Sequence, residues 1–202
     1  MTKPPLELYD VDARDDPLLA EYERARDLLQ GAGWKQGLET LERLAHQGSL
    51  MSMLLVSDAM RTGWMYDQDL PGAEAWYRVA VESGSARGLF GLALTYLQMG
   101  RFSEAIGNLE AAITRDFPPA YNALAGIYFR GDGVPVDKQR ALVLWCKGAA
   151  LGHLPAKRNL VRQRLQGHYG FRARIAGCLG LLPVVLEIVN LREVTPYTDR
   201  MR

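Results

Sequence analysis

Two glycines flank an acidic residue in "RGDGV", the stretch from Arg130 to Val134, and such a loop could cradle a phosphate or a metal ion. A phosphate-binding loop follows a strand and leads into a helix amino terminus, with Lys-Ser/Thr or further glycines. Neither flank of "RGDGV" has these features. The sequence therefore favours the alternative, a turn between two packed helices.

The other residues that could act as nucleophiles or metal ligands have no partner at a suitable spacing in the sequence. Cys146 precedes Lys147, a neighbour that slightly favours the thiolate, but no histidine is spaced to pair with it. No HxxxH or CxxC spacing supports a metal site, and the histidines stand near helix-ending glycines: His46, His153 and His168. We therefore expect no catalytic residue, no cofactor and no metal.

The composition is that of a soluble globular protein. The 202 residues are 48% hydrophobic and 23% charged, with a formal net charge of +1, which argues against a dedicated nucleic-acid binder. The charge is uneven, since residues 153–202 hold nine Lys/Arg and three Asp/Glu. This asymmetry suggests a docking surface at one end, although scattered solvated side chains would also explain it.

Two cysteines cannot form a disulfide framework, and the opening residues lack the apolar core of a secretory signal. We therefore expect a cytoplasmic protein. The most apolar stretch, Ile175–Val189, is shorter than the roughly 20 residues that a bilayer crossing needs, and it contains Pro183 and Glu187. It is expected to form a buried terminal helix, with contact to a membrane surface as the alternative.

The chain repeats itself at intervals of 32 and 36 residues. Ala73, Ala105 and Ala141 align, and each is followed four residues later by a large residue and then by a second small one. Each preceding segment ends at a glycine: Gly63, Gly100 or Gly131. Large residues at helical intervals and small residues where backbones approach predict stacked antiparallel helix pairs, a solenoid. "RGDGV" and the stretch after Gly63 then occupy the same interhelical turn in two copies.

The segment "YNALAGIYFRGDGVPVDKQRALVLWCKGAALGHLPAKRNL" resembles the Sel-one-like repeat, a relative of the tetratricopeptide repeat. The copy beginning "RGLFGLALTYLQMGRFSEA" resembles an ordinary tetratricopeptide repeat with a short turn. This resemblance implies an all-α superhelix of about five antiparallel helix pairs. It also implies function by binding, as a non-catalytic scaffold or adaptor that holds a protein or peptide on its concave groove.

Three segments are expected: an extended N-terminal arm (1–15), the repeat array (16–167), and an apolar C-terminal helical cap with a tail (168–202). Asp16 and Pro17 are expected to start the first helix, with Asp16 as its N-cap. The arm could lie in the groove or dock on a partner. The cap could close its own array or that of a second copy, giving a homo-oligomer.

In tetratricopeptide-like arrays the first helix of each pair lines the groove. The corresponding partner-binding candidates are Asp58, Arg61, Phe90, Leu94, Gln98, Asn122, Phe129, Arg130, Arg158 and Arg162. Their amide, guanidinium and aromatic groups suit capture of an extended peptide, although a solvated inner face is also consistent with them. Arg158 and Arg162 share one helical face and could grip an acidic partner segment, RNA or anionic lipid. Because few aromatic residues are interleaved, nucleic acid is disfavoured.

The leading hypothesis is a cytoplasmic adaptor that binds a partner protein or peptide in the groove. The first alternative is a membrane-proximal assembly factor whose basic and apolar C-terminal segment touches lipid or a membrane protein. The second is an enzyme on a helical scaffold, which would need converging titratable groups that the sequence does not supply.

Overall fold

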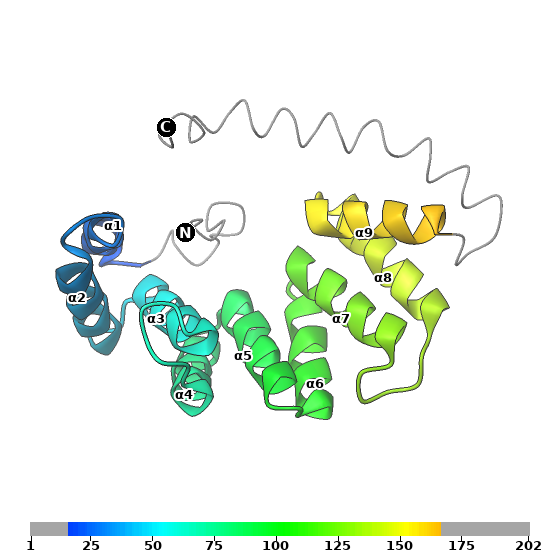
Figure 1. Cartoon of the computed structure of the whole chain (residues 1–202), viewed down its shortest axis with the longest axis horizontal. Helices are drawn as coiled ribbons and strands as arrows, with labels where there is room; N and C mark the ends of the chain where they lie inside the picture. Colours follow the sequence, from blue (N-terminus) through cyan, green and yellow to red (C-terminus); the bar gives the residue numbers. More distant parts are fainter. Residues whose placement is uncertain (1–15, 167–202) are drawn as a thin grey trace. The chain divides into compact units, whose positions relative to one another are not determined.

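The computed structural model describes residues 16–166, and these form helices and turns without a strand. Consecutive helices pack as antiparallel pairs (Figure 1), which confirms the all-α repeat fold. The chain divides into two compact units, one ending at Phe117 and the other beginning at Pro118. The first unit holds α1 (Leu19–Leu28), α2 (Trp34–His46), α3 (Leu50–Thr62), α4 (Leu70–Glu82), α5 (Ala86–Gln98) and α6 (Phe102–Ile113). The second holds α7 (Pro118–Arg130), α8 (Lys138–Ala150) and α9 (Leu154–Leu165).

Side-chain caps fix where several helices begin. The hydroxyl oxygens of Ser49 and Ser85 accept hydrogen bonds from the third backbone N–H of α3 and α5, at 3.2 and 2.9 Å. The imidazole of His153 does the same for α9 at 3.3 Å. Each cap follows a glycine with positive φ, at position 48, 84 or 152, a conformation that costs glycine little. A helix end and the next helix start are thus built from two adjacent residues.

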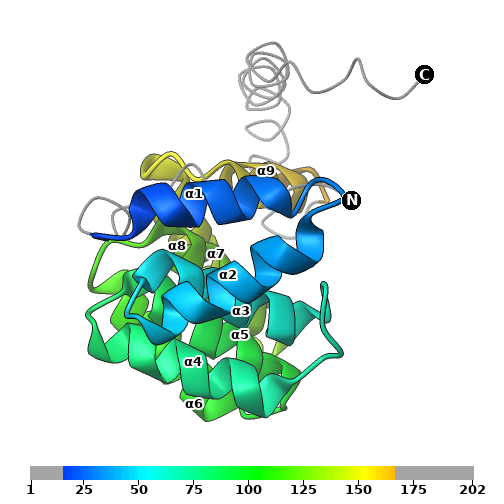
Figure 2. The same ribbon diagram turned by 90° about the vertical axis from the view of Figure 1, so that its left-hand side faces the viewer.

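The repeated small residues lie where the sequence predicts close packing. Ala73, Ala105 and Ala141 are fully buried. A Cβ added to Gly91 of α5 would stand 2.2 Å from a ring carbon of Tyr77, so the Tyr77 ring lies directly on the α5 backbone. Figure 2 shows α4 and α6 on one side of α3 and α5, as expected of second helices that back first helices. The predicted hairpin packing is confirmed within each unit.

The two long turns have the same construction. Gly63 and Gly131 have positive φ, and two residues later Met65 and Gly133 do too. Each turn closes with a backbone hydrogen bond back to the preceding helix, from Asp69 N to Met60 O at 3.0 Å and from Asp137 N to Tyr128 O at 2.8 Å. Asp69 and Asp137 then cap α4 and α8. "RGDGV" is therefore an interhelical turn, as its equivalence to the first turn predicts.

The start of α1 differs from its expected form. The helix begins at Leu19 with Leu18 at the N-cap, so the prediction that Asp16 caps it is wrong. The carboxylate of Asp16 is buried and reaches α3, where its Oδ2 accepts from Ser49 Oγ at 2.8 Å and from Met51 N at 2.9 Å. A third hydrogen bond comes from Leu18 N at 2.9 Å. The Oδ1 oxygen of Asp16 therefore stays on the local backbone before α1, while its Oδ2 oxygen joins that backbone to the positive end of α3.

Across residues 16–166 no helix is long and apolar enough to cross a membrane. The expected N-terminal arm and the apolar cap around Ile175–Val189 lie outside the described residues. The segment boundaries expected at residues 15 and 167 remain predictions.

Candidate functional site

The predicted partner-binding residues sit on the first helix of each pair, which gives them a shared side within each unit. In the first unit, α3 and α5 are in contact although α4 separates them in sequence. In the second unit, α7 and α9 are in contact across α8 in the same way. Side chains three or four residues apart on these helices therefore form two candidate faces, one in each unit.

The first face contains a cluster around Asp58, which we call the Asp58 cluster: Asp58, Arg61, Tyr77 and Arg87. Oδ1 of Asp58 accepts from the Tyr77 hydroxyl at 2.5 Å and from Arg61 Nη2 at 3.2 Å. Oδ2 accepts from Arg87 Nη2 at 3.1 Å. One carboxylate therefore links α3, α4 and α5.

Burial and charge set the protonation of this cluster. Two guanidinium groups share one carboxylate, and their side chains are only 15% (Arg61) and 16% (Arg87) exposed. Burial alone lowers the pKa of Arg61, but the Tyr77 oxygen and the Asp58 carboxylate outweigh it and raise that pKa. Burial and the Asp58 charge raise the pKa of Tyr77 well above its ordinary value, so its hydroxyl remains a donor. The cluster is a fixed array of hydrogen bonds around one carboxylate.

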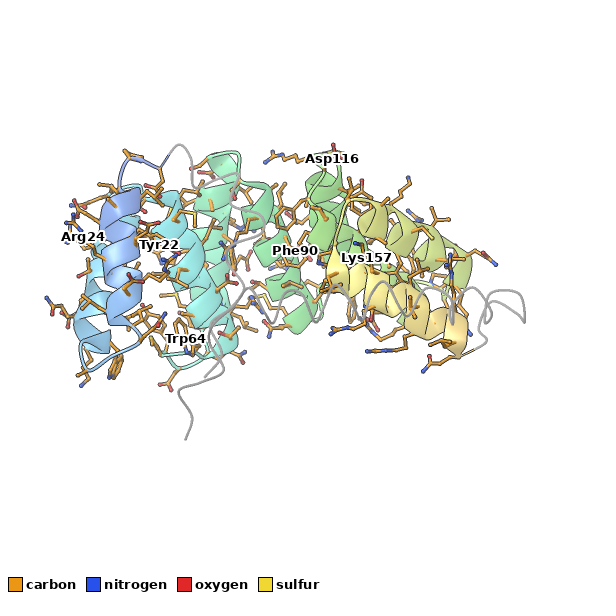
Figure 3. All side chains as sticks on the ribbon, turned by 90° about the horizontal axis from the view of Figure 1, so that it is seen from above. Tyr22, Arg24, Trp64, Phe90, Asp116 and Lys157 are labelled. Atoms are coloured by element: carbon orange, nitrogen blue, oxygen red, sulfur yellow. The ribbon has the colours of Figure 1, made fainter. Side chains whose placement is uncertain are left out.

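The remaining candidates of the first unit lie along α5. Phe90 (Figure 3) is half-buried, with its ring centroid 5.5 Å from that of Phe117. Leu94 is half-buried and Gln98 is exposed at the last residue of the helix. Phe90 and Leu94 thus offer part of their apolar surface beside the charged cluster, because residues 87, 90 and 94 share one side of α5.

The second face contains a polar group that we call the Asn122 cluster: Asn122, Trp145 and Asn159. The amide oxygen of Asn122 accepts from Trp145 Nε1 at 3.1 Å and from Asn159 Nδ2 at 2.9 Å. Two donors on that oxygen fix which way the Asn122 amide points. Its own NH₂ group has no acceptor among residues 16–166 and can donate to a ligand.

Aromatic and basic side chains surround the Asn122 cluster. Phe129 packs on Trp145 with ring centroids 5.4 Å apart. Arg130 is exposed and is held by Asp132, whose carboxylate accepts from Arg130 Nε at 2.7 Å. Arg158 and Arg162 are exposed on α9 and form no ion pair with any described residue. Helix α9 carries four Lys/Arg and no Asp or Glu, so this face is strongly basic.

Four members of these clusters are not among the predicted contacts: Tyr77 and Trp145, which the repeat pattern places at packing positions, and Arg87 and Asn159. Arg87 lies five residues before the aligned Leu92, outside the positions that the repeat pattern assigns to the groove. Its spacing of three from Phe90 is the signal that could have revealed it. Asn159 lies inside a helix, where asparagine is unfavourable unless its side chain has a specific partner. An asparagine inside a predicted helix is the signal that could have identified Asn159.

The arrangement suits recognition better than catalysis. Asp58 already accepts three hydrogen bonds, and each of its donors is a group that stays protonated near neutral pH. No group of three His, Cys, Asp or Glu side chains in the described part of the chain could hold a metal ion. What both faces do offer is oriented donors and positive charge, which bind carboxylates and backbone carbonyls.

The chain matches the Sel1 repeat model over residues 50–85 and 118–153. Each matched segment is one helix pair with a long turn, α3–α4 or α7–α8. The pair α5–α6, with its short turn, lies between the two matches. A search of curated proteins found no match.

Two solved structures have a similar fold. A Sel1 repeat protein from Oxalobacter formigenes is 20% identical with a TM-score of 0.65, over 84% of this chain and 74% of that one. A protein from Klebsiella pneumoniae subsp. pneumoniae, described as a sel1 repeat protein, is 22% identical with a TM-score of 0.56, over 90% and 92%. The fold is in general a scaffold for protein interactions. The chain thus carries two Sel1 repeats and has the fold of solved Sel1-repeat proteins.

Proposed function

We propose that this chain is a non-catalytic cytoplasmic adaptor that binds a partner protein or peptide on the faces formed by its first helices. The proposed contacts are Asp58, Arg61, Phe90, Leu94 and Gln98 on the first face, with Asn122, Phe129, Arg130, Arg158 and Arg162 on the second. The general role of the fold supports a scaffold, and the chemistry of these side chains supports a peptide ligand.

The observation that carries the proposal is the second face. Asn122 presents an oriented amide donor, and Arg158 and Arg162 are exposed cations without an ion pair among residues 16–166. An extended acidic segment matches this combination, because its backbone carbonyls accept from the amide and its carboxylates pair with guanidinium groups. The partner is therefore proposed to be acidic where it meets α9.

Affinity capture with charge-reversed variants tests this assignment. Arg158→Glu combined with Arg162→Glu should reduce retention of specific partners by about tenfold or more, because like charges then meet across the contact. The control is Lys147→Glu, an exposed cation on α8 of the same unit that belongs to neither face. Each bait is checked by circular dichroism for intact helix content.

Partners retained by the wild type and by Lys147→Glu but lost from the double variant would support the second face. Equal retention by the double variant would remove the basic face from the binding site. Flotation with anionic liposomes distinguishes the adaptor from the alternative, a membrane-proximal factor. Flotation of the wild type with vesicles, abolished by the double variant, would assign the face to lipid and overturn the adaptor proposal.

A further inference from the structure

A buried glutamine on α9, Gln163, has a polar atom that the fold leaves unused. Its side chain belongs to a residue that is 9% exposed, and its Oε1 has no hydrogen-bond donor among residues 16–166. A buried acceptor without a donor costs free energy. An N–H group supplied by a ligand would remove that cost.

Gln163 lies beside the Asn122 cluster. Asn159 donates to Asn122 Oδ1 at 2.9 Å, and Gln163 follows Asn159 by four residues, so both project from the same side of α9. Gln163 is therefore one helical turn, about 6 Å, further along the helix. Its amide makes no side-chain hydrogen bond within the described chain, so rotation about the last side-chain bond can turn Oε1 toward a ligand. The second face thus combines the donor NH₂ group of Asn122 with an acceptor one turn away.

A row of cations follows the same helix with the same spacing. Arg158 and Arg162 each directly precede one of the two amide residues of α9, so the arginine row lies about 100° around the helix from the amide row. Both arginines are exposed. Because they are four residues apart, their separation along the helix is also about 6 Å.

An extended ligand chain matches the spacing of both rows. Its residues rise about 3.3 Å each, so groups on one side of the chain recur about every 6.6 Å. Backbone groups of alternate residues can then meet the amide row while side chains of alternate residues meet the arginine row. A helical ligand does not fit, because its backbone N–H and C=O groups are already hydrogen-bonded to one another.

We propose that the second face binds an extended segment that carries acidic residues at alternate positions. Asn122 donates to a backbone carbonyl of this segment, and Gln163 accepts from one of its N–H groups. The two carboxylates pair with Arg158 and Arg162. This inference rests on the function proposed above for the same face, and it adds the conformation of the ligand, the spacing of its acidic residues and Gln163 as a contact.

Two fluorescent peptides of equal composition test the acidic spacing, with binding to the full chain followed by anisotropy at low salt. One peptide has two glutamates separated by a single threonine, and the other has the glutamates side by side. Threonine fills the remaining positions because it favours extended structure. The first peptide should bind about three- to fivefold more tightly, because only its carboxylates can reach both arginines at once. Equal binding of the two peptides, or no binding of either, would overturn the proposal.

Replacing peptide N–H groups by ester oxygens tests the backbone contact. In an extended chain the N–H groups of successive residues point to opposite sides, so replacement at alternate positions can be made in two registers. Binding of the first peptide should weaken about fivefold in one register and stay unchanged in the other. Equal effects in the two registers would contradict the proposed contact and overturn the inference.

The variant Gln163→Leu tests the acceptor itself. Leucine has a similar size and removes the oxygen that lacks a donor, so the urea midpoint should not fall, whereas binding of the first peptide should weaken about fivefold. The matched control is Gln139→Leu, at an exposed glutamine of α8, which should bind the peptide like the wild type. Unchanged binding by Gln163→Leu would overturn the role of Gln163. The peptide comparisons use the wild-type chain, so they decide the question even if the variant fails to fold.

Failure of this inference can be distinguished from failure of the adaptor proposal. Loss of partners from the Arg158→Glu, Arg162→Glu double variant, with no preference between the two peptides, would refute this inference alone. Selective binding of the first peptide, with partner capture unchanged in the double variant, would refute the adaptor proposal alone.

Discussion

Replacing His153 by serine should remove a pH-dependent loss of stability from the second unit. His153 is 6% exposed, and its Nδ1 accepts the hydrogen bond that caps α9. Burial lowers the pKa of His153 from 6.5 to about 4, so the side chain is neutral at pH 7 and can act as an acceptor. Protonation would remove this acceptor and place a positive charge at the positive end of a helix that already carries four cations.

The sign and size of the effect follow from the difference between the two pKa values. Below pH 6.5 the unfolded chain takes up a proton at His153 that the folded chain does not, so stability falls as the pH falls. The loss is complete near pH 4, at about 3 kcal/mol. At pH 5 it amounts to about 2 kcal/mol relative to pH 7.

Serine is the appropriate replacement because it is the residue that caps α3 and α5 at the same point of the repeat. Urea unfolding of wild type and His153→Ser, followed by far-UV circular dichroism at pH 7 and pH 5, gives the two pH dependences. Other titrating groups affect both chains alike, so the difference isolates His153. An NMR titration measures the pKa of His153 directly, and the imidazole signal of His153 is identified as the one that is missing from His153→Ser.

The wild type should lose about 2 kcal/mol more than His153→Ser between pH 7 and pH 5. An imidazole pKa above 6 in the folded protein would refute the reasoning. So would equal pH dependences in the two chains, since either result would mean that water or a negative charge stabilises the protonated ring.

Four further substitutions test the packing and the side-chain hydrogen bonds. Gly91→Ala should lower the free energy of unfolding by about 1–3 kcal/mol, because its Cβ would overlap the Tyr77 ring. Gly107→Ala in α6, where an added Cβ would meet nothing within 4 Å, should raise the free energy of unfolding by about 0.5–1 kcal/mol. Similar urea midpoints for these two variants would contradict the packing of Tyr77 on Gly91. Asp16→Ala should lower the free energy of unfolding by about 1–2 kcal/mol and speed amide exchange at Met51, and unchanged exchange would rule out the hydrogen bond from Met51 N to Asp16. Asn122→Ala should cost about 1–2 kcal/mol and shift Trp145 fluorescence to the red as water reaches Nε1, so an unshifted spectrum would count against the cluster.

The helix pairs were predictable because their determinants are local and repeated. Small residues such as Ala73 and Ala141, at a fixed distance from helix-ending glycines, specify where helices meet and stop. The same comparison between copies predicted the nature of "RGDGV", since a turn in one repeat must be a turn in the other.

The contacts between helices were less predictable. Asp16 has the expected residue type for a cap, but its partner Ser49 lies 33 residues away. Local sequence cannot rank that partner against the nearby N–H groups of α1. Only the packed arrangement of α1 and α3 brings it within reach.

The candidate faces were predictable in part for the same reason. Asp58 and Arg61 are three residues apart on one helix, so their proximity follows from helix geometry. The pairing of Asp58 with Arg87 depends on how α3 and α5 pack, and it turns an expected contact residue into one already bound within the chain. For Asn122, the repeat gave the position, and the structure adds which end of its amide is available.

The two long turns bear on how such a protein can diversify. In the first turn Trp64 and Met65 pack on the core, and the Tyr66 hydroxyl donates to Glu42 at 2.6 Å. In the second turn a backbone hydrogen bond closes the base and Asp137 starts the next helix, while Pro135 and Val136 are exposed. Substitutions at Pro135 and Val136 therefore meet fewer constraints than those in the first turn, so the second hairpin can vary its tip while the scaffold beneath stays unchanged.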